Sequence, residues 1–391
     1  MSAPEYRDFL ADAPRVDAFR RAIESTVSAG QLVLDLGTGI GTYAMFAARA
    51  GARVLAVEMQ PVIDLARTLA ADNGLSERIT FLRGRLEELD PPELADVLVF
   101  EDFSPFLYHA GTAHLLERVR ERWLKPSAVS VPRAVSAWLA PVSCPDSYRT
   151  ITPWSDGQAF GLDVARFSRQ LLNDLHPVAW DPQVLLADAE LVGRVNPLAL
   201  DAFSLEAAVR WEAARAGELH GLGLWVELDL AEGVRFSNAP SGRSSGWDQR
   251  FLPLAQPVAV QAGEVIEAQV RTLGPSKQGP TWWSWRVRAA GEEQEMDTFR
   301  GLPLSLDQVR RASLDHRPAL GARGRLRRAA LELMDGQHTV GEIARALRER
   351  FPEQLSNDAE AYRVVARELA DNENHVTNVT GQRPIETSTV K

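Results

Sequence analysis

A glycine-rich turn near the start of the chain has the residue types and spacing of a ligand-binding loop. In the run VLDLGTGIGTYA, at residues 33–44, an apolar stretch ends at Asp35 and a helical pattern begins after the last glycine. Glycines adopt positive φ readily and let a ligand approach the backbone closely. The bound ligand then lies at the carboxyl edge of a parallel sheet, where the strand order reverses. The glycines concerned are Gly37, Gly39 and Gly41.

An acidic residue at the end of the next apolar run places a second ligand-binding side chain at the carboxyl edge of the predicted sheet. The stretch ARVLAVEMQ places Glu58 at the carboxyl end of a predicted strand, where a carboxylate can bind the hydroxyls of a ribose. The alternative is a solvated surface glutamate. Dinucleotide enzymes use similar glycine turns, so the turn alone does not identify the cofactor. Together, the turn and Glu58 predict a cofactor that contains a ribose.

The elements that must position these residues alternate between strand and helix from about residue 30 to 132. The apolar runs QLVLDL, ARVLAV, ITFL and DVLVF are typical of buried parallel strands, and helical stretches lie between them. This pattern predicts an α/β doubly wound domain. From 133 to about 300, short alternating runs separated by Gly, Pro, Ser and Asn indicate antiparallel β structure. Arg-rich amphipathic helices follow from about 304, and a polar tail without periodicity is expected at 373–391.

The bulk properties restrict the class of protein further. A chain of 391 residues is too long for one ordinary core, so two or three domains are expected. The net charge of −10 and a pI near 5.4 give no broad electrostatic footprint for nucleic acid. One cysteine, Cys144, fits a reducing compartment. The charged N-terminal segment and the absence of a stretch of ~20 apolar residues predict a cytoplasmic protein without a membrane helix.

Taken together, the segments over residues 7–132 resemble the protein arginine methyltransferases nearly one by one. The matching runs include VLDLGTGIG, MFAARAGA, VEMQ, DNGLSERITFLRGRLEEL, ADVLVFE and WLKP. The resemblance implies S-adenosylmethionine as the cofactor and a Rossmann-like cofactor domain. It places Asp35 and the three glycines at the methionine part of the cofactor, and Glu58 at the ribose. It also places Glu87 at the adenine amino group, and we group Met59, which follows Glu58, with these cofactor-binding residues.

The N-terminal segment FLADAPRVDAF is similar to the opening helix of the same family. By that resemblance Arg15 meets the carboxylate of the cofactor. The alternative for Arg15 is an exposed arginine on a helix. No metal site is expected.

The substrate side departs from the family pattern. A guanidinium has a pKa above ~12, so it arrives as a cation with its nitrogens in a planar fork. The family grips that fork with two glutamates after the fourth strand and so orients one nitrogen toward the methyl group. In the run FEDFSPFLYHAGTAH, Glu101 matches the first glutamate, but Ala110 stands at the position of the second. The histidine of the family's Thr-His-Trp loop is also missing, since Gly246 precedes Trp247 and Gln249 there.

Two explanations of this departure remain open. Asp102 could point into the site with His109 or His114 and rebuild a guanidinium clamp. Alternatively the acceptor is not arginine, because an amine, amide, imidazole or carboxylate needs only one orienting carboxylate or base. Glu101 or His109 would then be that base, although a structural role in the loop fits His109 equally well. We favour the second explanation, with Glu101, Asp102 and His109 as the candidate catalytic residues.

The resemblance continues more thinly into the β region. The segment 148–169 is similar to the family's arm, which reaches into a partner subunit and closes a head-to-tail dimer, so a homodimer is expected. The stretch HGLGLWVELDL at 220–230 is similar to a central barrel strand. Nearby aromatic residues are better explained as core or interface packing than as a substrate cage. These are Trp225, Trp282, Trp283 and Trp285.

The C-terminal region lies outside the arginine methyltransferase pattern. The run RGRLRRAALELMDGQHTVGEIARALRERFP resembles small winged-helix domains of the PqqD type, which recognise precursor peptides. Thr339 and Glu342 have the spacing of a capping box that opens a helix. The resemblance implies capture of a leader peptide by strand addition, and the arginines could meet an acidic leader. A solvated helix face is the alternative, and DNA-binding helix–turn–helix modules share the pattern. The arginines are Arg310, Arg311, Arg317, Arg323, Arg325, Arg327 and Arg328.

We therefore expect a methyltransferase domain at 1–132, an antiparallel β-barrel domain with its arm at 133–303, and a helical winged-helix-like domain at 304–372. The expected activity is methyl transfer from S-adenosylmethionine to a residue of a peptide, with the precursor of a ribosomally made natural product as the substrate. One alternative is a genuine protein arginine N-methyltransferase. The other is a catalytically silent scaffold that binds peptides, against which a complete cofactor pocket argues.

Overall fold

The computed structural model separates into two units, residues 1–303 and 304–391, which we describe one at a time. The residues that the structure describes are 3–101, 110–154, 157–199, 204–241, 247–273, 281–302, 306–311 and 315–372.

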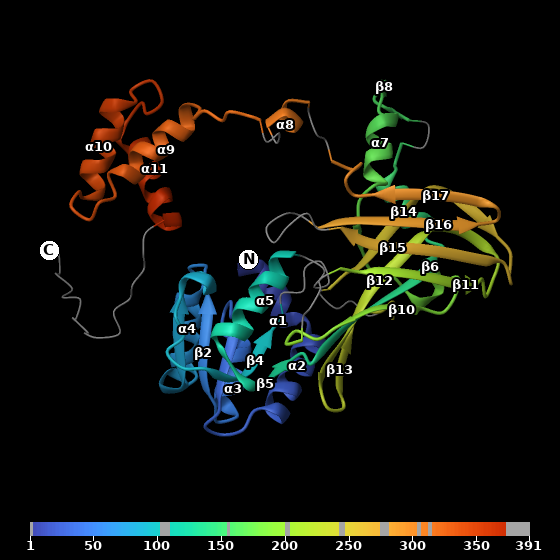
Figure 1. Ribbon diagram of the computed structural model, residues 1–391, viewed down its shortest axis with the longest axis horizontal. Coiled ribbons are helices and arrows are strands. Elements are labelled where there is room, and N and C mark those ends of the chain that lie inside the picture. Colours follow the sequence, from blue (N-terminus) through green and yellow to red (C-terminus); the bar gives the residue numbers. More distant parts are fainter. Residues whose placement is uncertain are drawn as a thin grey trace. The chain divides into compact units, whose positions relative to one another are not determined.

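A parallel five-stranded sheet forms the cofactor-side part of the first unit (Figure 1). Its order is β3-β2-β1-β4-β5, so the chain runs outward from β1 in one direction and then returns to continue on the other side. The strand order reverses between β1 and β4, where an open parallel sheet leaves a crevice at its carboxyl ends. The strands are β1 (Leu32–Leu36), β2 (Arg53–Glu58), β3 (Ile79–Arg83), β4 (Ala95–Phe100) and β5 (Leu124–Val131). This is the doubly wound sheet that the sequence predicts.

Helices and short turns connect these strands and supply the walls of the crevice. Two helices precede the sheet, and the second buries Phe19 and Ile23 completely. The helices are α1 (Ala3–Ala11), α2 (Ala13–Thr26), α3 (Thr42–Arg49), α4 (Ile63–Asp72) and α5 (Ala110–Arg122). Two 3-10 turns flank β3, namely η1 (Ser76–Arg78) and η2 (Leu86–Glu88).

The β region consists of two antiparallel sheets. One has the order β10-β6-β12-β14-β9 with β13 paired to β12, and the other the order β11-β15-β16-β17. The predicted barrel is thus a pair of sheets in the described part of the chain, rather than one hydrogen-bonded ring. The first sheet contains β6 (Ala134–Val142), β9 (His176–Val178), β10 (Glu190–Val195), β12 (Gly217–Ala231), β13 (Val234–Ser237) and β14 (Gln249–Val260). The second contains β11 (Glu206–Glu212), β15 (Val265–Leu273), β16 (Trp282–Ala289) and β17 (Glu292–Asp297).

The tryptophans of this region pack in the interior. Trp225, Trp283 and Trp285 are almost fully buried, and Trp282 lies edge-on to Phe299 with ring centroids 5.2 Å apart. They are packing residues, as the sequence predicts.

The segment that resembles a dimer arm folds into short elements with an exposed apolar tip. These are α6 (Pro145–Ile151), β7 (Gln158–Ala159), β8 (Leu162–Asp163), α7 (Ala165–Leu171) and, after it, η3 (Pro182–Val184). Phe160 is fully exposed, and Leu162 and Phe167 are 67% and 49% exposed. Apolar side chains this open are typical of a surface that another molecule covers.

The second unit is helical, with a separate small core. Leu326, Ile343, Leu347 and Val365 are buried where three helices meet. Thr339 and Glu342 make both bonds of the predicted capping box. The described residues of this unit contain no strand, so they include no sheet edge for strand addition, and the winged-helix assignment stays a prediction. The helices are α8 (Leu306–Arg311), α9 (Ala322–Glu332), α10 (Val340–Arg350) and α11 (Asp358–Asn372). Within the described ranges, every helix is too short or too polar to cross a bilayer.

Candidate active site

The glycine turn after β1 has the backbone that its sequence predicts. Gly37, Gly39 and Gly41 have φ values of 75°, 55° and 82°, a region that side chains with a Cβ rarely adopt. A Cβ on Gly39 would also lie 2.8 Å from the ring of Tyr6, so glycine is needed there for space as well. The turn brings the chain from the end of β1 into the first turn of α3.

The Asp35 side chain stabilises the conformation of this turn through hydrogen bonds. Its carboxylate accepts hydrogen bonds from the Thr38 hydroxyl at 2.5 Å and from the Ala44 amide at 3.0 Å. Burial of the charge raises the pKa of Asp35 to about 6, against the effect of these two bonds. The side chain is 2% exposed, so Asp35 acts on the cofactor site chiefly by fixing the shape of the loop.

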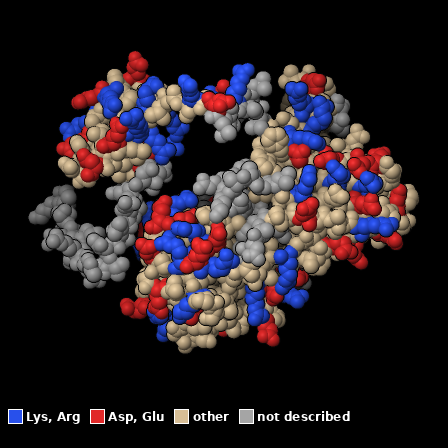
Figure 2. Space-filling view, viewed as in Figure 1, with Lys and Arg blue, Asp and Glu red and all other residues tan. Residues whose placement is uncertain are grey.

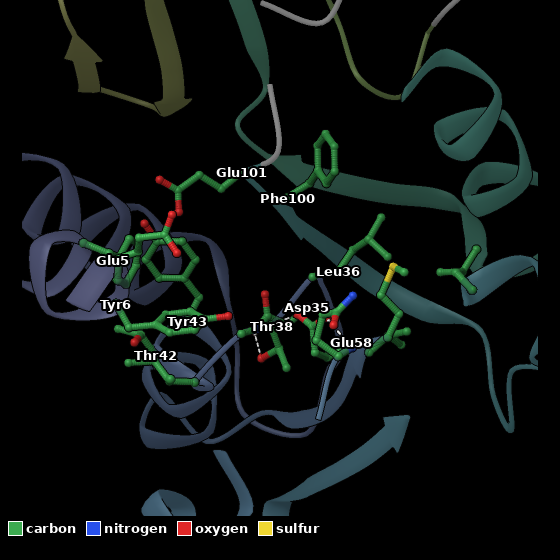
Figure 3. Close-up of a pocket in the computed structure, with 18 of the residues that line it drawn as sticks. Glu5, Tyr6, Asp35, Leu36, Thr38, Thr42, Tyr43, Glu58, Phe100 and Glu101 are labelled. Atoms are coloured by element: carbon green, nitrogen blue, oxygen red, sulfur yellow. Dashed lines mark hydrogen bonds between the residues drawn. The ribbon is translucent and has the colours of Figure 1, made fainter. Parts of the chain in front are cut away.

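A cavity of about 740 Å³ opens above the turn and collects most of the predicted cofactor residues (Figure 3). This volume is within the ~300–1,000 Å³ of small-molecule sites. Predicted residues on its wall are Arg15, Asp35, Gly37, Gly39, Glu58, Met59, Glu87 and Glu101. Gly41 is outside the wall, since it precedes α3 and packs against Ala66. Asp102 and His109 lie outside the described residues.

Glu58 is oriented by the backbone at the end of β2. One carboxylate oxygen accepts from the Gly39 amide at 3.1 Å and the other from the Gln60 amide at 2.8 Å. A carboxylate has about four acceptor sites, so lone pairs remain for two hydroxyls of a ribose. Glu87, on η2, lines the same cavity after β3. The donor set fits the cofactor that the resemblance implies.

We expect replacement of Glu58 with alanine to weaken the binding of S-adenosylhomocysteine by about 10- to 100-fold, or ~1.5–3 kcal/mol, the usual value of a hydrogen bond to a charged acceptor. Titration calorimetry measures this directly. Glu88→Ala is the matched control, because Glu88 is 70% exposed and its neighbour Glu87, not Glu88, lines the cavity. Equal affinity in the Glu58 variant and in wild type would remove Glu58 from the ribose site.

Arg15 and Glu101 meet on the opposite wall of the cavity. The Arg15 guanidinium lies 3.3 Å from Glu101 and 3.2 Å from Asp12, and its side chain is 6% exposed. The rings of Phe9 and Trp247 flank it, with centroids 5.0 and 5.1 Å from its central carbon. The alternative of an exposed helix arginine is thus wrong. Arg15 is instead a buried cation on the cavity wall, where it can bind a cofactor carboxylate.

Glu101 follows β4 at the crevice, apart from Asp35 and Glu58 in Figure 3. Burial raises its pKa to about 7, and the Arg15 charge and the Tyr43 hydroxyl act in the opposite direction. A carboxyl group with a pKa near neutrality can accept a proton from a nucleophile at physiological pH.

Two further residues of the predicted substrate side, Ala110 and His114, lie within the described part of the chain. Ala110, in place of the family's second glutamate, is the first residue of α5. His114 lies on the same helix, pairs with Glu117 at 3.2 Å and is absent from the cavity wall. His114 therefore does not contribute to the guanidinium clamp that was one of the two explanations from the sequence.

Three aromatic residues on the wall were not singled out by the sequence as ligands of this cavity. Tyr6 and Phe9 come from α1, and Tyr43 is the second residue of α3. The signal for Tyr43 was its place directly after the glycine turn, where helix residues face the ligand. Trp247 was matched in the resemblance, but its contact with Arg15 joins the β region to the cofactor wall and could not be seen in the sequence.

Comparison with known proteins gives consistent results. Residues 33–127 match the family model of a methyltransferase domain. An arginine N(omega)-methyltransferase of Streptomyces achromogenes subsp. streptozoticus is 34% identical over 66% of this chain and 73% of its own length. A probable histone-arginine methyltransferase 1.3 of Arabidopsis thaliana is 27% identical over 70% of this chain, which spans about half (55%) of that protein.

Solved structures show the same fold. The Trypanosoma brucei PRMT1 enzyme-prozyme complex with AdoHcy aligns with a TM-score of 0.64 at 21% identity, covering 74% of this chain and 96% of that one. Protein arginine methyltransferase 10 of Arabidopsis thaliana aligns with a TM-score of 0.66 at 22% identity, covering 76% and 98%. The Streptomyces relative, 34% identical and covered over 73% of its length, shows the family of this chain. The chain belongs to the arginine methyltransferase family and is an enzyme that uses S-adenosylmethionine as its cofactor.

Proposed function

We propose that the chain transfers the methyl group of S-adenosylmethionine to a guanidinium nitrogen of arginine. The observation that carries this is the Glu101 carboxyl group, which lies on the wall of the cofactor cavity and pairs with Arg15. The name of the Streptomyces relative, 34% identical, supports arginine as the acceptor. This reverses the preference that the sequence alone suggested for another nucleophile.

In this proposal each charged side chain has one task. Bound cofactor supplies an electrophilic methyl group on a sulfonium. Arg15 holds the carboxylate of the cofactor, and Glu58 holds its ribose. Glu101 accepts hydrogen bonds from the guanidinium and turns one nitrogen toward the methyl carbon. The cofactor would supply the methyl group and take up the electrons of the broken carbon–sulfur bond as a neutral thioether, and Glu101 would accept the proton of the attacking nitrogen.

A second candidate is methyl transfer to a different nitrogen or oxygen of a peptide. It is favoured by Ala110, which occupies the position of the second glutamate at the start of α5. One carboxylate can orient a nucleophile that has no planar fork.

The acceptor assay separates these two candidates. Free L-arginine and an arginine-containing peptide are incubated with isotopically labelled S-adenosylmethionine, and products are located by mass spectrometry. The matched control is the same peptide with citrulline, whose neutral urea has the shape of the guanidinium without its charge. We expect label on arginine and none on citrulline. Label on citrulline, or on another residue of the peptide, would establish the second candidate.

We also propose that the active form is a homodimer in the cytoplasm. The exposed Phe160 and Leu162 at the tip of the arm support the dimer. The buried, unpaired Cys144 is consistent with a reducing compartment.

For the C-terminal unit we propose recruitment of an acidic peptide, such as the leader of a natural-product precursor. A shallow groove between α9 and α11 is lined by Leu326, Leu355 and Val364, by Arg323 and Arg363, and by Gln354 and Glu360, whose carboxylate accepts hydrogen bonds from Ser356. These two arginines form no ion pair in the part of the chain that the structure describes. Other arginines do, for example Arg328 with Glu332, and Figure 2 shows both charge signs interspersed over these helices. Arg311, Arg327 and Arg328 of the run are thus engaged by carboxylates of the same unit, and we propose the groove as the part that receives an acidic, partly apolar ligand.

Truncation after Pro303 tests this recruitment. We expect the shortened protein to bind S-adenosylhomocysteine as well as the full chain does, because the cofactor cavity lies entirely within residues 1–303. Its KM for a leader-bearing precursor should rise by about tenfold or more, since a tether provides roughly millimolar effective concentration, while kcat changes little. Steady-state kinetics on the precursor and on its isolated core peptide measure both values. Equal KM values for the precursor in the two proteins would leave the C-terminal unit without a role in recruitment.

A further inference from the structure

Tyr43 is a buried polar residue whose hydroxyl interacts with the candidate catalytic carboxyl group of Glu101. It is 6% exposed and is the second residue of α3, the helix that begins directly after Gly41. Its ring stacks on Phe19 with centroids 4.7 Å apart and planes 13° apart, and meets the edge of Phe9 at 5.7 Å. These contacts fix the ring plane, so the direction of the hydroxyl is fixed as well.

The fixed hydroxyl faces the carboxyl group of Glu101 on the cavity wall. The contact falls short of an ideal hydrogen bond, because neither the Tyr43 hydroxyl nor the Glu101 oxygen nearest Arg15 has a partner of good geometry within the described residues. Each group nevertheless acts on the other: burial and then Glu101 raise the pKa of Tyr43, while Arg15 and then Tyr43 oppose the rise that burial causes in the pKa of Glu101. Leaving a buried hydroxyl without a partner is unfavourable, and native proteins rarely do so without a functional reason.

The surroundings of Glu101 show what the hydroxyl adds. Arg15 and Asp12 come from α2 and the residue before it, Asp35 comes from β1, and Tyr43 comes from α3. Arg15 is the one cation among these groups, and it also has to bind the cofactor carboxylate. When it does so, part of its attraction for Glu101 is lost. A neutral donor on a rigid ring then remains to hold the carboxylate in place.

We propose that Tyr43 is a positioning residue for methyl transfer: its hydroxyl donates to one oxygen of Glu101 and leaves the other oxygen free for the N–H groups of the acceptor. This inference depends on the proposed role of Glu101. It also accounts for a site with one acceptor-binding glutamate, since one carboxylate held from two sides has a defined orientation. A phenylalanine at position 43 would keep the stacking and remove only this donor.

The test is Tyr43→Phe, followed by two readouts. The first needs no acceptor: glutamate is labelled with ¹³C at its carboxyl carbon, and the titration of Glu101 is followed by NMR and assigned by its absence in Glu101→Gln. Loss of a donor to the carboxylate should move the midpoint to higher pH. The second is turnover on the acceptor identified above, where we expect kcat to fall about tenfold with little change in cofactor affinity. Tyr6→Phe removes another hydroxyl of the same cavity, one near Glu58 and Glu5, and should leave the Glu101 midpoint in place.

The outcomes separate this inference from the function on which it depends. An unchanged Glu101 midpoint together with wild-type kcat in Tyr43→Phe would overturn the positioning role even if Glu101→Gln is inactive. Full activity of Glu101→Gln would instead contradict the proposed role of Glu101 itself. In the double variant, Tyr43→Phe should have no further effect on kcat, because its partner has lost the charge. An additive loss would mean that Tyr43 acts elsewhere, and would also overturn the proposal.

Discussion

Replacement of Glu101 with glutamine is expected to lower kcat about a thousandfold while the affinity for S-adenosylhomocysteine changes by no more than about twofold. The change is nearly isosteric, so the fold and the cavity wall remain. A neutral amide, however, neither attracts a cationic guanidinium nor accepts the proton that leaves with methyl transfer, and such groups contribute about 10²–10⁴ in rate. Steady-state kinetics and calorimetry on the same preparation separate the two effects.

Glu93→Gln is the matched control for this variant. Glu93 pairs with Arg53 on the surface and is not on the cavity wall, so the same substitution there should leave kcat unchanged. A Glu101→Gln enzyme with wild-type turnover would show that the carboxylate is a structural partner of Arg15 and nothing more.

The pH dependence of the wild-type enzyme follows from the same group. The pKa of Glu101 is raised to about 7, so the carboxylate form is lost as the pH falls through neutrality. Because the proposed mechanism needs the carboxylate, kcat/KM should fall on the acid side with an inflection near 7. The inflection should disappear in the residual activity of Glu101→Gln, where no titrating group is left at this position.

The cofactor half of the site could be predicted from the sequence because its residues act locally. The positive φ of Gly39 and the place of Glu58 at a strand end both follow from a few neighbouring residues. The predicted position of Arg15 depended on resemblance. Its burial depends on Phe9, Trp247 and Glu101, which are distant in sequence and meet only in the folded chain. Spacing within a segment carries no information about such contacts.

The residues that bind the acceptor were harder to predict from the sequence, because their contacts also form only in the folded chain. The sequence showed Ala110 in place of a glutamate, and it suggested histidines as substitutes. His114 instead pairs with Glu117 on its own helix, an i, i+3 contact that the α5 pattern allowed but did not require. Tyr43 went unassigned because a tyrosine in the first turn of a helix is more often an ordinary core residue. Only the folded chain shows that Phe19 fixes the plane of its ring and that its hydroxyl interacts with Glu101.

Loss of the arm tip should convert the protein to a monomer and reduce its activity at least tenfold. Phe160 and Leu162 are the most exposed apolar residues of the arm, and burying each against a partner would contribute ~1.5–3 kcal/mol. The double change Phe160→Ser and Leu162→Ser should therefore weaken dimerisation by more than about a hundredfold. If the arm contacts the partner's cofactor-binding half, monomers also lose packing around the helices that line the cavity. Sedimentation velocity and kinetics at the same micromolar concentration test both effects.

Leu191→Ser provides the comparison for the arm variant. Leu191 is 47% exposed on β10, outside the arm, so its replacement removes a similar exposed apolar side chain without touching the tip. This control should remain a dimer with full activity. If the arm variant and wild type sediment alike, as monomers or as dimers, the tip does not hold the subunits together. An active monomer would further show that one chain completes the site by itself, because Arg15, Glu58 and Glu101 all come from the same chain. In that case the exposed phenylalanine and leucine would have to serve a different partner.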